Sequence, residues 1–534
     1  MRVNDYAVDL RKYIKNFDKI YAHIDGCQKE TIIEHIDLCL KYLNEIIDIK
    51  KLDQVIDKII GCSGWNLKDE NKDLFFKLFI NTVVFHDIGK INPKFQNDKM
   101  NNDLKLNLPI ERNYQSKHSL LSSYLYIGYF SDVINILPVK EKMFFIMILY
   151  LNAFIISRHH SFVNNFDFDF MNDIISENDI NNNFINWINN YIVIMLNDAS
   201  KVELIKSRTW KKIKFKLSKQ STDFDITLYT YSRLLHSILV ACDYYATSEF
   251  KNKRGIKLES VCFDDIIDAY NSTNLIRTIR NSNLDEIVGI NKLRTSIFLE
   301  AEHNLINNLD SNVFYLEAPT GSGKSNTALN LSLQLVNRCE NLDKIIYVYP
   351  FNTLVEQNLE NLSMIFNGSN IMNQVATINS VTPIKVDDEI SILYSENEKY
   401  QQALLDRQFM NYPIILTTHV SLFDTMFGNN RDSTFGFYQL INSVIVLDEI
   451  QSYRIEIWNE IIIFLKQYAK ILNLKIIIMS ATLPNLELLA LDESNSVELL
   501  KNKEIYYQNP IFKNRVQIDY SLLGLDNIED ILLK

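Results

Sequence analysis

Apolar residues recur every three or four positions through the first half of the chain. The spacing is clear in the stretches Thr31 to Ile46, Lys72 to Phe85 and Ser232 to Ala246. An apolar stripe with this period is typical of an amphipathic helix that packs one face on a core. We therefore expect an all-α domain over residues 1–265.

The pattern changes at about residue 311, where short β-branched runs begin to alternate with helical segments. This alternation predicts a parallel sheet with crossover helices, in an α/β lobe over residues 290–500. The expected strands are VFYLEA, IIYVYP, IILTT, VIVLDE and KIIIMSAT, with helices after Lys324, after Asn352, after His419 and after Arg454.

Two segments fall outside these domains. Residues 266–289 are polar, include the low-complexity run NSTNLIRTIRNSN and lack a sustained apolar face, so we expect a linker there. The tail, residues 501–534, contains RVQIDYSLL, which predicts one more strand but is too short to build another α/β lobe. The fold class is therefore multidomain, an all-α domain followed by an α/β lobe.

A phosphate-binding loop is indicated by APTGSGKS, Ala318 to Ser325, which lies between a predicted strand and a predicted helix. Gly321 and Gly323 let backbone N–H groups face phosphates, Lys324 reaches the β and γ phosphates, and Ser325 offers a hydroxyl to magnesium. The alternative is a chance glycine-rich turn. The general pattern has glycine at the position of Ala318, a departure common in superfamily 2 helicases. The predicted nucleotide-binding residues are Thr320, Gly321, Ser322, Gly323, Lys324 and Ser325, joined by Asp448 and Glu449.

The second nucleotide-binding element is VIVLDEIQ. Asp448 can hold magnesium, and Glu449 can orient and deprotonate the attacking water. Such paired acids otherwise occur as a helix N-cap. With SATLP, YPFNTLVEQ and LTTHVSLFDTM, the order of motifs resembles the first RecA-like lobe of a superfamily 2 DExD/H-box helicase. Because such motors complete the ATP site with a second lobe, we expect this chain alone to bind ATP weakly and hydrolyse it poorly unless another polypeptide or a C-terminal part supplies that lobe.

The helical half carries a series of histidines and aspartates that suits a metal site. Imidazole and carboxylate ligands without a thiolate favour Mn, Fe, Co, Ni or Mg over structural zinc, and seven candidates can serve two divalent ions with Asp87 between them. The alternative for any one of these histidines taken alone is a hydrogen-bonded residue of the core. We leave out His23 and His236 as packing or surface residues, and also His303 and His419, although His419 lies in a presumed strand-binding loop. The candidate ligands are His35, His86, Asp87, His118, His159, His160 and Asp243.

The adjacent pair His86-Asp87 resembles the namesake motif of HD phosphohydrolases. That resemblance implies one ion on His35, His86, Asp87 and Asp243 and a second on Asp87, His118, His159 and His160. It also implies that Lys90 steadies the scissile phosphate, so the predicted catalytic residues are Asp87, Lys90 and Glu449.

Charge and composition limit the binding partners, cysteine chemistry and cellular location that we expect. The formal net charge of −11 gives no general attraction to nucleic acid, so DNA binding would need local basic surface. The stretches 206–219 and 251–257 are candidates, although a solvated helix face explains them equally well. Six cysteines without a Cys-x-x-Cys pair argue against a zinc ribbon or disulfide framework. No apolar run is long enough to span a membrane and no secretory signal is evident, so a cytoplasmic location is expected.

Taken in this order, the metal motifs and the helicase motifs are similar to those of the type I CRISPR-associated nuclease-helicase. The resemblance implies cutting of single-stranded DNA, ATP-driven movement, and recruitment by an RNA-guided surveillance complex. Two alternatives stay open: an HD nucleotide phosphohydrolase whose P-loop lobe senses ATP, and a truncated regulatory protein that docks without motor activity.

Overall fold

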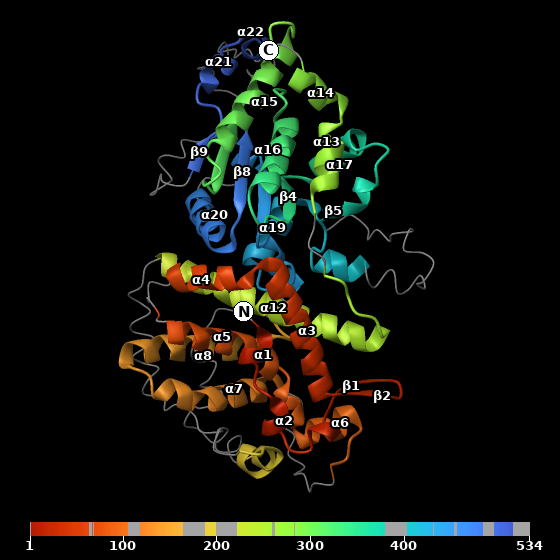
Figure 1. The fold of residues 1–534 in the computed structure, drawn as a ribbon, viewed down its shortest axis with the longest axis vertical. Helices are drawn as coiled ribbons and strands as arrows, with labels where there is room; N and C mark the ends of the chain where they lie inside the picture. The colour runs from red at the N-terminus through yellow and green to blue at the C-terminus, as the bar shows by residue number, and fades with distance from the viewer. Residues whose placement is uncertain are drawn as a thin grey trace, which may run out of the picture.

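The computed structural model describes residues 2–62, 67, 69–104, 118–163, 187–198, 222–258, 262–281, 284–379, 403–430, 432–452, 457–483 and 496–515. It has a helical domain followed by an α/β domain, which lie one above the other in Figure 1. The expected multidomain organisation is therefore confirmed. The basic stretch 206–219, and the tail strand beyond Arg515, lie outside the described residues.

Long helices form most of the first domain. They include α3 (Ile32–Lys50), α4 (Leu52–Cys62), α5 (Asp69–Phe85), α7 (His118–Asn135), α8 (Val139–Arg158) and α12 (Thr222–Asn252), with the short α1 (Val3–Tyr6), α2 (Leu10–Tyr13) and α6 (Pro93–Met100). Helix α3 begins with a capping box in which Thr31 and Glu34 satisfy each other's backbone N–H groups. Helices α5, α7, α8 and α12 pack together around a core rich in fully buried Phe and Tyr.

The helical domain also contains a β-hairpin, so the all-α expectation was wrong here. Strands β1 (Tyr21–Asp25) and β2 (Gln28–Thr31) pair antiparallel, with His23 directly opposite Glu30. The strands are joined by the two-residue turn Gly26-Cys27, in which Gly26 takes the left-handed φ of 56° that such a turn requires of its first residue.

Seven parallel strands form the sheet of the second domain, in the order β5-β6-β4-β7-β8-β3-β9. All five predicted strands are present, and the short β5 and β9 were not predicted. The strands are β3 (Val313–Glu317), β4 (Lys344–Tyr349), β5 (Val375–Ile378), β6 (Ile414–Thr418), β7 (Ser443–Asp448), β8 (Lys475–Ser480) and β9 (Ser496–Glu498). The crossover helices are α16 (Lys324–Arg338), α17 (Asn352–Ile365), α19 (His419–Phe427) and α20 (Trp458–Leu472). Strands β4 and β8 are buried throughout, as expected for a sheet covered on both faces.

The segment expected to be a linker is instead largely helical. It contains most of α13 (Asp264–Asn271) and all of α14 (Asn274–Asn281), which precede α15 (Ile290–Ile306). The side chains of Ile266, Tyr270 and Ile276 are buried in the core of the α/β domain. The polar composition hid this amphipathic pattern, in which these three buried apolar side chains attach the two short helices to that core.

The two domains share a buried boundary along α12, and α4 lies there as well (Figure 1). The guanidinium of Arg233 donates hydrogen bonds to the carbonyls of Gly428 and Thr425, both at 2.6 Å. Lys50, at the end of α3, forms a buried ion pair with Asp343 of the second domain at 2.8 Å. One apolar cluster runs from α12 into α20. In the described residues, no helix has the length and hydropathy needed to cross a membrane.

Candidate metal centre and nucleotide site

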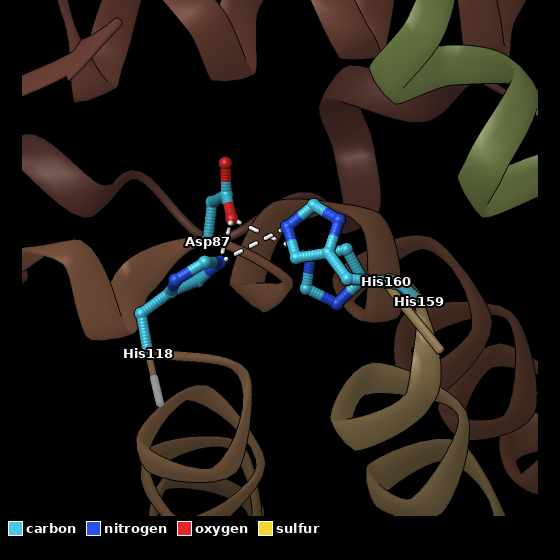
Figure 2. Close-up of side chains that lie close together, drawn as sticks. All are labelled: Asp87, His118, His159 and His160. Carbon is cyan, nitrogen blue, oxygen red and sulfur yellow. Dashed lines mark hydrogen bonds and ion pairs between the residues drawn. The ribbon is translucent and has the colours of Figure 1, made fainter. Parts of the chain in front are cut away.

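The seven predicted metal-ligand candidates lie together. They come from five separate places in the chain: α3, the end of α5, the start of α7, the end of α8, and α12. Figure 2 shows His118, His159 and His160 pointing toward Asp87. The Nε2 atoms of His118 and His159 lie 3.2 and 3.6 Å from Asp87 Oδ1. The folding of the helical domain thus gathers side chains that are far apart in the sequence.

The other oxygen of Asp87 faces a second group. Its Oδ2 lies 3.5 Å from the Nε2 atoms of both His35 and His86. Asp243 Oδ1 lies 3.4 Å from His35 Nε2 and 3.8 Å from His86 Nε2. Asp87 therefore lies between two sets of imidazoles, with one oxygen directed at each set.

Backbone carbonyls fix the orientation of two of these rings. His86 Nδ1–H donates to Val83 O at 2.7 Å, and His159 Nδ1–H donates to Ile156 O at 2.6 Å. Each ring then presents the lone pair of Nε2 to the cluster. Both Nε2 atoms are buried, and neither has a hydrogen-bond partner in the described part of the chain. Buried acceptors aimed at a common point with their outer nitrogens anchored are the arrangement that metal-ligating histidines adopt, so the residues fit divalent ions.

The charges also suit cations. Burial alone would raise the pKa of Asp87, but Lys90 and His86 hold it well below its usual value. Burial would likewise raise the pKa of Asp243, yet the adjacent imidazoles of His35 and His86 hold it well below that of an ordinary aspartate. Both carboxylates are therefore ionised at neutral pH. Lys90 Nζ lies 2.6 Å from Asp87 Oδ2 and is itself buried, so its ammonium is already paired within the protein.

Close backbone packing places His118. The turn Ile88–Ile91, a short 3-10 helix labelled η2, lies directly against the start of α7. A Cβ on Gly89 would lie 2.0 Å from the carbonyl oxygen of His118, so no side chain fits there. Gly89 N–H also donates to Ser122 Oγ at 2.8 Å. This approach brings the first residue of α7 within reach of Asp87.

Three residues next to this cluster are not among the predicted ligands: His23, Glu30 and Cys39. His23 was read as a packing or surface residue, but its Nε2 lies 3.0 Å from Lys90 Nζ and its Nδ1 lies 2.7 Å from Glu30 Oε2. His23 is also within range of a possible ligand set with His35, Asp87 and Asp243. A turn at Gly26-Cys27 pairs Asp25 with Gln28 and so aligns His23 with Glu30, and Gly26 is the sequence signal that could have revealed this pair. Cys39 Sγ, 3.6 Å from His35 Nε2, is a further buried neighbour.

The remaining histidines lie elsewhere. His236 is buried at the domain boundary, where its Nδ1 is 2.8 Å from Thr434 Oγ1. His303 lies on α15, where its Nε2 is 3.0 Å from Asn307 Nδ2. His419 is buried and donates from Nε2 to the carbonyl of Asp448 at 2.8 Å, so it supports the end of β7 from within.

The predicted phosphate-binding loop lies between β3 and α16. Gly321 and Gly323 have φ values of 78° and 87°, which only glycine adopts readily, and Gly323 is the N-cap of α16. The loop forms one wall of a cavity of about 760 Å³, whose lining includes Gly321, Gly323, Lys324, Ser325, Asp448 and Glu449. Lys324 Nζ donates to Ala318 O at 3.0 Å across the loop. The backbone amides at a helix N-terminus and the lysine form a site suited to nucleotide phosphates.

Acidic residues also line this cavity. Burial, with the neighbouring charge of Glu449, raises the pKa of Asp448 to about 7. Such a carboxyl gains its charge most readily when a cation is bound beside it. Ser480 Oγ donates to Gln451 Oε1 at 2.6 Å and accepts from the backbone N–H of Thr482 at 3.0 Å. The SATLP motif is thereby tied to the segment after Asp448 and Glu449.

The basic segment 251–257 begins in the last turn of α12. The side chains of Lys251, Lys253, Arg254 and Lys257 are exposed. Lys253 Nζ lies 4.3 Å from the centre of the Phe250 ring. DNA binding by this segment remains a prediction.

Comparison with known proteins supports the helicase motifs. Residues 298–489 match the family model for DEAD/DEAH box helicases. No curated protein matches the sequence.

Solved structures share the fold of most of the chain. The crystal structure of T. fusca Cas3 with ATP has 14% sequence identity and a TM-score of 0.51, and the match covers 87% of this chain and 50% of that one. The same protein with ADP gives 13% identity, a TM-score of 0.51 and the same coverage. A crystal structure of a CRISPR-associated protein gives 12% identity and a TM-score of 0.51, with 95% of this chain and 55% of that one covered.

This chain thus spans about half the length of the solved structures that it matches. At such low identity, the likeness establishes the fold, and the family match establishes the helicase domain, with the ATP and magnesium that such a domain uses. The chain therefore contains a DEAD/DEAH box helicase domain, and its fold is Cas3-like.

Proposed function

We propose that this protein is a metal-dependent nuclease that cuts single-stranded DNA and is coupled to an ATP-driven helicase. Its setting would be CRISPR interference on DNA marked by an RNA-guided surveillance complex, with an HD-type helical domain as the cutting unit. The observation that carries the proposal is the convergence of His35, His86, Asp87, His118, His159, His160 and Asp243 in the domain that precedes the helicase. Completion of the motor by a second RecA-like lobe, in this or another chain, is part of the proposal.

The ligand sets follow from the two sides of Asp87. His35, His86 and Asp243 would hold one ion with Asp87 Oδ2, and His118, His159 and His160 would hold the other with Oδ1. When bound, two such ions polarise a phosphodiester and lower the pKa of a water. Oxygen and nitrogen ligands suit Mn, Fe, Co, Ni or Mg.

The chain's own residues would position the substrate. His160 is exposed and the His118 side chain is 12% exposed, whereas His35, His86 and His159 are buried. A phosphate would therefore approach from the side of His118 and His160. Lys90 would balance the negative charge that a phosphate brings beside Asp87. In the helicase domain, Lys324 and Ser325 would bind nucleotide phosphates, while Asp448 would hold magnesium and Glu449 would activate water.

Cleavage assays on single-stranded DNA test this function. Metal-stripped protein is supplied with Mn²⁺ or Co²⁺, and wild type is compared with Asp87→Ala and with Asp25→Ala, which removes an exposed acid from the hairpin. We expect metal-dependent cleavage by wild type and Asp25→Ala, and its loss in Asp87→Ala. Hydrolysis of free dNTPs with no DNA cleavage would instead support a nucleotide phosphohydrolase. No hydrolysis by any of the three would support a docking protein.

A further inference from the structure

The β1–β2 hairpin brings a buried acid to the edge of the metal cluster. Glu30 is 2% exposed and lies opposite His23 in the strand register. A buried carboxylate is costly unless charged or polar groups satisfy it. Two ring nitrogens lie close to Glu30 Oε2, His23 Nδ1 at 2.7 Å and His35 Nδ1 at 3.4 Å, so the buried carboxylate has polar neighbours. The hairpin thus places an anion just outside the candidate ligands.

The neighbours of His23 define which ring nitrogen carries its proton. The ammonium of Lys90 has only donors, so His23 Nε2, 3.0 Å away, must accept from it. The proton is then on Nδ1, which donates to Glu30 Oε2 at 2.7 Å. Because Lys90 Nζ is also 2.6 Å from Asp87 Oδ2, an unbroken chain of contacts runs from Glu30 to Asp87.

The same oxygen of Glu30 also faces a candidate ligand. His35 Nδ1 is buried, makes no hydrogen bond among the described residues, and lies 3.4 Å from Glu30 Oε2. His35 Nε2 faces Asp87 and Asp243 on the opposite side of the ring. The rings of His23 and His35 meet edge to face with centroids 4.6 Å apart.

His35 differs in this respect from the other buried imidazoles. The Nδ1 atoms of His86 and His159 face neutral backbone carbonyls, whereas that of His35 faces a carboxylate. A carboxylate behind a ligating imidazole fixes its tautomer and increases its basicity, and removing such a partner typically lowers metal affinity about 10- to 100-fold.

We infer that Glu30 is a positioning residue of the metal centre, which orients His35 directly and Lys90 through His23. This inference rests on the proposed two-ion site and assigns the hairpin a role in it. The carboxylate of Glu30 then orients both His35, a ligand of the first ion, and Lys90, the cation beside Asp87. The ion on His118, His159 and His160 has no such connection to Glu30, so the two ions should respond differently to its removal.

Metal titration of stripped protein tests this role. Glu30→Gln keeps the size of the side chain and removes its charge, and Asp25→Asn removes a charge from the same hairpin at an exposed position. Titration with Co²⁺, followed by calorimetry and by the visible absorption of the bound ion, gives stoichiometry, affinity and ligand geometry. We expect two ions in wild type and in Asp25→Asn. In Glu30→Gln, one ion should bind about 10- to 100-fold more weakly, with an altered spectrum, and the other as in wild type.

The outcomes separate the two proposals. If wild type binds no Co²⁺, the proposed metal centre fails, and this inference fails with it. If wild type binds two ions and a folded Glu30→Gln binds both with unchanged affinity and spectrum, the metal centre stands and the role of Glu30 is refuted.

A second measurement does not depend on the folding of Glu30→Gln. Long-range ¹H–¹⁵N correlation spectra of wild type report the tautomer of His23, whose signals are assigned by their loss in His23→Gln. We expect a neutral ring protonated on Nδ1. A ring protonated on Nε2 would break the connection between Glu30 and Lys90 and overturn the inference.

Discussion

The replacement Gly89→Ala should disable one half of the candidate metal centre without touching a ligand. Its Cβ would lie 2.0 Å from the carbonyl oxygen of His118, 2.8 Å from the carbonyl carbon and 3.0 Å from the Cα. Gly89 does not have a left-handed φ, so the lack of space alone excludes a side chain. Restoring even a 3.0 Å separation requires the start of α7 to move by about 1 Å.

This movement is large for a metal site. Ligand distances in such sites hold to within about 0.2 Å, so His118 would be displaced by several times the tolerance. The shift would also strain the hydrogen bond from Gly89 N–H to Ser122. We expect the affinity for one ion to fall about 10- to 100-fold, comparable to the loss of an orienting partner, and overpacking to cost about 1–3 kcal/mol of unfolding free energy.

Calorimetric titration with Mn²⁺ and thermal unfolding measure these two effects, and cleavage of single-stranded DNA gives a third readout. Gly61→Ala is the matched control, because a Cβ at that position on α4 meets nothing within 4 Å. It should stabilise the protein by about 0.5–1 kcal/mol through helix propensity and leave metal binding unchanged. Tight binding of both ions by a Gly89→Ala protein of wild-type stability would show that His118 is not a ligand or that its position is not set by this contact.

Three other replacements test separate parts of the structure. Burial and the nearby charge of Lys50 lower the pKa of Lys344 from 10.5 to about 7. Because the unfolded chain then binds more protons between pH 7 and 10.5, Lys344 should make the protein more stable as pH rises through this range, by at most about 1.4 kcal/mol per unit. Melting temperatures at pH 7, 8 and 9 should show a smaller rise in Lys344→Met than in the exposed control Lys12→Met, and equal slopes would contradict the shift. Lys324→Ala should weaken binding of a fluorescent ATP analogue with magnesium more than tenfold and leave Mn²⁺ binding by the helical domain unchanged; retained nucleotide affinity would exclude Lys324 from the site. Arg233→Ala leaves the carbonyls of Gly428 and Thr425 without their donor, so thermal unfolding should show that the free energy of unfolding falls by about 2–4 kcal/mol. Arg11→Ala, on the surface, should lower it by less than about 1 kcal/mol. Similar losses in both variants would argue against a tight boundary between the domains.

Much of the architecture was predictable because its signals are local. The apolar periods of α3, α5 and α12, and the β-branched runs of the five central strands, are each contained in one stretch of sequence. The phosphate-binding loop was equally clear, since its glycines lie between a strand and a helix. Strands β5 and β9 have only four and three residues, too few for a periodic pattern, and they occupy the two edges of the sheet.

The candidate metal ligands show which contacts the sequence could not predict. The order of the histidines and aspartates suggested which residues would meet, and the structure brings those seven side chains together. The sequence could not show that His23 approaches Lys90, because that contact depends on strand pairing and on the packing of the hairpin against η2. The contacts of Arg233 were also out of reach, since the carbonyls it binds lie almost 200 residues further along the chain.

The single helix α12 fixes the distance between the helicase domain and the candidate metal ligands. Arg233, which binds the helicase domain, and Asp243, a candidate metal ligand, are ten residues apart on this helix, or about 15 Å along its axis. If one domain rotated against the other, α12 would have to bend, or its apolar side would have to separate from α20. If a strand of DNA passes from the helicase to the ions, the number of nucleotides between them should therefore be constant, and the first cut should fall at a fixed interval from the point where the strand is gripped.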